Sequence, residues 1–115
     1  MKHEESDLQK ACVRWFAMQY PEQRGLLCSN LSNTSGHNPV HGRINKAMGL
    51  MPGRSDLVYY RNGRAYMIEV KTAKGRQSDS QKAWQKKIEK EGFSYVIVRS
   101  IEEFINLINH INKTL

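Results

Sequence analysis

The fold of this chain is decided by residues 56–71, DLVYYRNGRAYMIEVK. Two runs rich in β-branched and aromatic residues, 57–60 and 65–71, flank a four-residue segment with Asn62-Gly63 at its centre. Asn-Gly between two such runs is among the strongest short-range signals for a β-hairpin, because both residues accept the left-handed backbone of a tight turn. The sequence therefore predicts an antiparallel strand pair that turns at residues 62 and 63.

Charged residues lie at the open end of this predicted hairpin. Glu69 and Lys71 are two apart, so they share one face of their strand, while Val70 points to the other face. A turn near residues 62 and 63 places position 69 opposite position 56 to within one residue. We therefore expect Asp56, Glu69 and Lys71 to lie together.

This trio predicts a particular chemistry. Neighbouring carboxylates repel each other unless a cation lies between them, and carboxylate oxygens suit Mg²⁺. A Mg²⁺ held by Asp56 and Glu69 can polarise a phosphate and lower the pKa of a bound water, while Lys71 positions the water or stabilises the developing charge. The alternative is a surface strand with a cross-face ion pair, because Glu-x-Lys is common by chance.

The residues before the hairpin predict a helix, a strand and a loop. Residues 8–16 place Leu8, Ala11, Cys12, Trp15 and Phe16 on one helical face, and Pro21 ends the run. Residues 26–31 favour a strand. Residues 32–42 are rich in Ser, Asn, Gly and His and predict an irregular loop, and residues 43–50 could form a short helix.

The residues after the hairpin predict a helix, a strand and a second helix. Ser78 to Gln81 has the form of a capping box, and the helix that follows should bury Ala83, Trp84 and Ile88 and stop at Gly92. Residues 95–98 favour a buried strand. A second capping box, Ser100 to Glu103, opens a helix whose apolar face comprises Ile101, Phe104, Ile105, Ile108 and Ile111. Both tryptophans, Trp15 and Trp84, are expected in the core rather than as base-stacking platforms.

Together these elements predict an α/β fold in the order α-β-(α)-β-β-α-β-α. The strand, helix, strand succession near the C-terminus requires a crossover connection, so the central sheet should be mixed. At 115 residues the chain is long enough for one core, and we expect one domain over residues 1–115.

The balance of charge favours an anionic partner. The chain carries 18 Lys and Arg against 11 Asp and Glu, a net charge of +7. Nucleic acid is the first candidate, because clustered cations gain from phosphate contacts. Residues 71–90 alone hold seven cations and two acids, and they include the predicted DNA-binding residues Lys74, Arg76, Lys82, Lys86 and Lys90. The last three recur every four residues and should form a stripe on the helix, whereas the alternative is an ordinary solvated face.

Other features narrow the class of protein. Cys12 and Cys28 lack the spacing and density of a disulfide scaffold, so we expect buried thiols in a reducing, cytoplasmic compartment such as that of a bacterium or a phage-infected cell. No run is apolar enough for a membrane span. His37 and His41 are four apart, but Gly36, Pro39 and Gly42 argue against the helix that a zinc site there would need.

The surroundings of the hairpin complete a resemblance. Pro52-Gly53-Arg54-Ser55-Asp56-Leu57 precedes the first strand, Glu69-Val70-Lys71 closes the second, Gly75 to Gln81 enters a helix, and an N-terminal helix carries Glu5 and Gln9. In these residues the chain resembles the VRR-NUC (virus-type replication-repair nuclease) family of the PD-(D/E)XK superfamily. The resemblance covers nearly the whole chain. It departs from the usual Pro-Asp motif, because Ser55 precedes Asp56.

The resemblance implies roles for five residues. Asp56 and Glu69 would be metal ligands, with the main-chain carbonyl of Val70 commonly contributing, and Lys71 would be the catalytic lysine. Glu5 would be an accessory acid that binds the metal directly or through water, although Glu4 competes for this role and a solvated first-turn residue is the alternative. Gln81 would be an active-site polar residue, unless it only completes its capping box.

The expected function is Mg²⁺-dependent DNA endonuclease, with Mn²⁺ as a substitute metal. The chain resembles the small members of the family, and this resemblance implies a homodimer that acts on branched DNA such as four-way junctions. Plain duplex cutting would use the same residues. A non-catalytic DNA-binding module with the same fold, and a nuclease that acts on RNA, are the alternatives.

Overall fold

The computed structural model describes residues 2–30, 47–49 and 51–113. The predicted loop at residues 32–42 with its two histidines, and most of the predicted short helix at residues 43–50, lie outside this range. The described elements, in chain order, are α1 (Lys2–Gln19), the short 3-10 helix η1 (Pro21–Gln23), β1 (Leu27–Ser29), β2 (Leu57–Arg61), β3 (Arg64–Val70), α3 (Asp79–Lys90), β4 (Ser94–Val98) and α4 (Ile101–Lys113).

The described strands form one mixed sheet in the order β1-β2-β3-β4. β1, β2 and β3 pair antiparallel, whereas β3 and β4 pair parallel. The parallel pair requires the crossover through α3, as the sequence predicted. β3 therefore lies inside the sheet with a partner on each side; Glu69 lies near its end, and Lys71 follows it directly.

The hairpin has the predicted turn and register. Asn62 and Gly63 both have positive φ, 50° and 76°, the backbone that a two-residue hairpin turn of this kind requires. Leu57 pairs with Ile68. One step further along this antiparallel register, Asp56 comes opposite Glu69, as expected.

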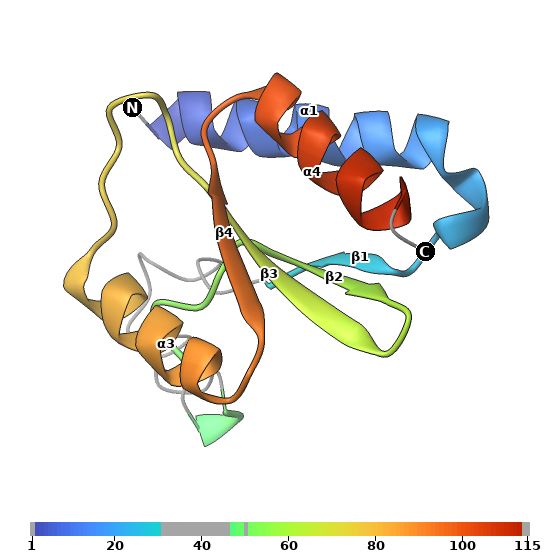
Figure 1. Cartoon of the computed structure of the whole chain (residues 1–115). Helices are drawn as coiled ribbons and strands as arrows, with labels where there is room; N and C mark the ends of the chain where they lie inside the picture. Colours follow the sequence, from blue (N-terminus) through green and yellow to red (C-terminus); the bar gives the residue numbers. More distant parts are fainter. Residues whose placement is uncertain (1, 31–46, 50, 114–115) are drawn as a thin grey trace.

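Helices cover both faces of the sheet. Figure 1 shows α1 and α4 over one face and α3 on the opposite side. The main core lies between the sheet and the α1–α4 pair, and its buried residues include Cys12, Phe16, Tyr59, Phe104 and Ile108. A smaller second core lies beneath α3, where Trp84 and Ile88 pack against the buried residues Val58, Met67 and Tyr95.

Side-chain burial confirms most of the predicted faces and corrects two. Trp15 packs against the main core and Trp84 against the second core. Ala83 was expected to be buried but is exposed, because α3 has only one layer of contact with the sheet and presents no fully buried residue. Cys28 was also expected to be buried; it is only half-buried, because β1 is an edge strand, and its thiol donates to the carbonyl of Gly25 at 3.2 Å. Cys12 is fully buried.

Both predicted helix starts have capping hydrogen bonds. At α3, Ser78 and Gln81 form the complete reciprocal box. At α4, the Ser100 hydroxyl accepts from the backbone N–H of Glu103 at 3.1 Å, but the Glu103 carboxylate reaches one residue further back, to the N–H of Arg99 at 2.7 Å. Within the described residues, none of the helices is long and apolar enough to cross a membrane.

Candidate active site

Asp56 and Glu69 lie together where β2 and β3 begin to separate. Oδ2 of Asp56 accepts the backbone N–H of Val70 at 2.7 Å, so a strand amide fixes this carboxylate. The Val70 side chain itself is buried in the main core, so only its main chain faces the carboxylate pair. Glu69 is 1% exposed. Strand geometry thus presents two acidic side chains to one small volume.

Lys71 completes the predicted trio. Its Nζ lies 3.6 Å from Oε2 of Glu69, and its side chain is also buried. When both carboxylates are ionised, one ammonium leaves one negative charge uncompensated. Such a site favours a cation, because desolvated like charges repel strongly.

The pKa values of both carboxyl groups are raised, as this repulsion would cause. Burial, and after it the charge of Asp56, raise the pKa of Glu69 to about 8 although the charge of Lys71 acts in the opposite direction. Burial likewise raises the pKa of Asp56, against the stabilising hydrogen bond from Val70. The two carboxylates therefore hinder each other's ionisation when no cation is close.

Gln81 reaches the site from the first turn of α3. Its Oε1 accepts the N–H of Ser78 at 2.8 Å, which completes the capping box, and its Nε2 donates to Oε2 of Glu69 at 2.8 Å. The two interpretations of this residue were posed as alternatives. In the structure the two are compatible, because the amide oxygen completes the capping box while the amide nitrogen contacts Glu69. The capping box therefore determines that the nitrogen faces Glu69.

Glu5 approaches the site from α1. It is half-buried, and its charge contributes to raising the pKa of Asp56. A Cβ atom added to Gly75 would lie 3.0 Å from Oε2 of Glu5, so this carboxylate rests against the turn that follows Lys71. Glu4, its competitor in the sequence, is exposed.

The carboxylate pair suits a hard cation such as Mg²⁺. All its donors are oxygen atoms, and Mg²⁺ is commonly held by one or two carboxylates together with waters and substrate phosphates. Among the described residues, no three His, Cys, Asp or Glu side chains form a ready-made ligand cluster. The chemistry of Asp56 and Glu69 therefore fits a hard cation, and Glu5 is the next nearest acid described above.

The segment before Asp56 is anchored without the proline of the usual motif. Ser55 is fully buried, and its hydroxyl donates to the carbonyl of Leu57 at 2.9 Å. Asn30 donates its side-chain amide to the Ser55 carbonyl at 3.0 Å and its backbone N–H to the Asp56 carbonyl at 2.9 Å. These bonds hold the Asp56 backbone in place, and no sequence pattern predicted the role of Asn30.

Gly53 brings this segment against α3. Its φ is +87°, and an added Cβ would lie 2.3 Å from the carbonyl oxygen of Ser80. Only glycine allows both the left-handed backbone and this close approach. The contact brings the segment that leads to Asp56 close to the first turn of α3, which carries Gln81.

We expect Gly53→Ala to lower the free energy of unfolding by about 3 kcal/mol, because it combines backbone strain with a clash against backbone. Gly92 is a matched control, since its φ is +96° but its added Cβ would meet nothing within 4 Å. Gly92→Ala should cost only about 1 kcal/mol. Urea denaturation measures both changes, and equal losses would show that the contact with Ser80 is unimportant.

Three further residues support the site and were not found from the sequence. The Tyr95 hydroxyl lies 3.5 Å from Oε1 of Glu69, and Gln77 Nε2 lies 3.3 Å from that hydroxyl. Burial raises the pKa of Tyr95 to about 12, with the charge of Glu69 adding to the effect. Arg99 donates from Nη1 to the carbonyls of Thr72 and Gly75 at 2.8 and 2.7 Å, which braces the turn after Lys71.

The predicted DNA-binding residues are all exposed. Lys82, Lys86 and Lys90, here called the basic stripe, lie on α3, whose opposite side packs on the second core through Trp84 and Ile88. Lys74 and Arg76 precede the same helix. The stripe therefore starts beside Gln81 and leads away from the carboxylate pair.

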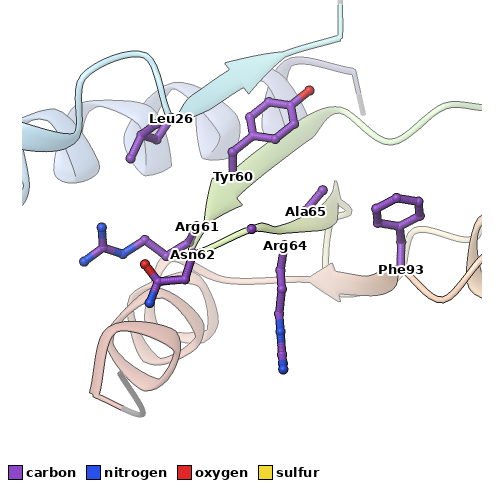
Figure 2. Close-up of a pocket in the computed structure, with 8 residues that line it drawn as sticks. Leu26, Tyr60, Arg61, Asn62, Arg64, Ala65 and Phe93 are labelled. Carbon is purple, nitrogen blue, oxygen red and sulfur yellow. The ribbon is translucent and has the colours of Figure 1, made fainter.

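A separate pocket of about 440 Å³ opens at the other end of the hairpin. Figure 2 shows Tyr60, Ala65 and Phe93 projecting to one side there, whereas the Arg64 side chain points to the other. None of the predicted site residues lines it. The candidate active site and this pocket are thus distinct.

Comparison with known proteins agrees with this geometry. A sequence profile of the VRR-NUC domain matches residues 3–102. The chain belongs to the VRR-NUC domain family. Membership of this VRR-NUC family implies nuclease activity in general and an interaction with DNA.

A solved structure supports the fold of this VRR-NUC chain. It is a "VRR_NUC domain protein" with 24% sequence identity and a TM-score of 0.70, and the match covers 92% of this chain and 85% of that one. The predicted PD-(D/E)XK-like architecture is thereby confirmed. No curated protein matches the chain significantly.

Proposed function

We propose that this VRR-NUC chain is a Mg²⁺-dependent DNA endonuclease. The observation that carries the proposal is the trio of half-buried Asp56 with buried Glu69 and Lys71, in which Lys71 Nζ lies 3.6 Å from Glu69 Oε2. A structural ion pair would need one carboxylate for one ammonium. The second carboxylate, fixed by the Val70 amide, is explained by a cation.

Each residue then has a defined task. Asp56 and Glu69 would hold the metal together with the Val70 carbonyl, and Glu5 would bind it directly or through water. Bound Mg²⁺ would polarise a phosphate at the site and lower the pKa of a bound water. Lys71 orients that water and stabilises the charge that develops on the phosphate oxygens as the new P–O bond forms and an ester P–O bond breaks. Gln81 holds the Glu69 carboxylate from α3.

We propose branched DNA, such as a four-way junction, as the substrate, and a homodimer as the acting form. Both proposals are supported by the resemblance to small members of the family. Two sites related by a two-fold axis would suit a symmetric junction. Mn²⁺ is expected to replace Mg²⁺.

The experiment is a cleavage assay with Mg²⁺ or Mn²⁺ on four-way junction, flap, duplex and single-stranded DNA, with a matched RNA duplex. Preferential cutting of the junction supports the full proposal. Cutting of plain duplex DNA alone, or of RNA alone, would change the assigned substrate but leave the assigned chemistry unchanged. Binding without any cutting would identify a DNA-binding module instead.

The basic stripe should bind the phosphate backbone. We expect the triple change of Lys82, Lys86 and Lys90 to Gln to weaken DNA binding and to reduce the slope of log K against log salt by up to about 3. Fluorescence anisotropy at several salt concentrations measures this. The control changes three exposed cations outside α3, Lys10, Arg14 and Lys113, to Gln, which removes the same charge. If both triples weaken binding equally, the stripe is an ordinary solvated face.

A further inference from the structure

Tyr95 lies beside Glu69 on the neighbouring strand. In the parallel register Met67 pairs with Tyr95 and Glu69 pairs with Ile97, so Tyr95 is two residues before the partner of Glu69 and on the same face. Its ring belongs to the second core and lies 6.1 Å from that of Trp84. The hydroxyl at the end of this buried ring approaches Oε1 of Glu69.

The direction of the Tyr95 hydrogen bond is fixed by a chain of amides. Gln85 donates from Nε2 to the Glu89 carboxylate at 3.2 Å, and a carboxylate can only accept, so Oε1 of Gln85 faces the other way. That oxygen accepts from Gln77 Nε2 at 2.9 Å. The same Nε2 donates to the Tyr95 oxygen at 3.3 Å. The Tyr95 proton is therefore left for Glu69.

Glu69 consequently has donors on both of its oxygens. Gln81 and Lys71 lie at Oε2, and Tyr95 lies at Oε1. The Tyr95 contact is 3.5 Å, a length common in substrate-free sites, where such bonds tighten only in the working complex. Donors from α3, from β4 and from Lys71 just after β3 thus oppose rotation of the Glu69 carboxylate.

We infer that Tyr95 is a positioning residue that sets the orientation of Glu69 toward its metal, and that Gln77 acts only through Tyr95. The inference rests on the proposed function, because it assigns Glu69 as a ligand. Groups that orient metal ligands in this way typically account for about 10- to 100-fold in metal affinity or activity. Neither residue contacts the reacting atoms.

Tyr95→Phe removes the hydroxyl and keeps the ring. We expect the Mg²⁺ concentration for half-maximal cleavage and the Kd for Mn²⁺ to rise about 10-fold or more. Calorimetry measures the Mn²⁺ Kd without any substrate. A purely structural role would instead lower the unfolding midpoint and leave the metal dependence unchanged. Tyr60→Phe is the matched control, because Tyr60 lines the pocket at the far end of the hairpin (Figure 2).

Gln77→Leu tests the relay. It should raise the same two quantities, and it should add little in the Tyr95→Phe background, because the two residues act in series. Additive effects would overturn the role of Gln77. Unchanged metal dependence in Tyr95→Phe would overturn the role of Tyr95.

Measurements of Mn²⁺ binding and cleavage by the wild-type protein distinguish a failure of this inference from a failure of the proposed function. If it binds Mn²⁺ but cuts no nucleic acid, the proposed function fails while the Mn²⁺ affinities still decide the role of Tyr95. If it cuts DNA and the two variants match it, only the inference fails. If it neither binds Mn²⁺ nor cuts, both fail.

Discussion

Glu69→Gln is expected to slow DNA cleavage at least about a thousandfold, because it removes one of the two charges that would hold the metal in the proposed function. The glutamine has nearly the same volume, and its oxygen can still accept a hydrogen bond, so the strand should keep its place. Single-turnover cleavage of the preferred DNA at saturating protein measures the effect without interference from binding.

The control for this change is Glu102→Gln, an equal loss of charge at an exposed position in the first turn of α4. It should leave the cleavage rate within about twofold of the wild type, since surface substitutions have small effects. Cleavage by Glu69→Gln at a rate near that of the control would contradict the site assignment.

Lys71→Met is expected to reduce the rate of the cleavage step by about 10²- to 10³-fold, while DNA affinity stays close to that of the wild type. Methionine keeps the unbranched, buried stem of the side chain and removes the ammonium that lies beside Glu69. The rate is measured in single turnover, and the affinity by anisotropy in the absence of metal.

The nearby exposed lysine, Lys74, provides the comparison. Lys74→Met removes the same charge from a predicted backbone contact, so it should weaken DNA binding slightly and spare the rate of the bound complex. If Lys71→Met instead lost DNA affinity and Lys74→Met lost cleavage rate, Lys71 would be a DNA-binding residue and Lys74 the catalytic one.

Local signals predicted most of the fold. The Asn62-Gly63 turn determined the hairpin, its register placed Asp56 opposite Glu69, and the crossover through α3 determined the parallel strand. These features depend on residues close in sequence, where turn chemistry and strand alternation act directly.

What the sequence could not predict depends on three-dimensional packing. Tyr95 looked like one more apolar strand residue, and its approach to Glu69 exists only because β4 pairs in parallel with β3. Asn30 and Arg99 act on backbone carbonyls, and such bonds leave no residue pattern. Ala83 was misjudged because the depth of contact beneath a helix depends on what lies opposite it.

The bond between the Val70 amide and Asp56 makes the site observable by spectroscopy. This amide proton belongs to a core strand, so it should exchange slowly with solvent while its acceptor stays in place. Its NMR resonance also senses the charge of the acceptor directly. One backbone signal would therefore report whether an added cation binds at Asp56, before any DNA is present.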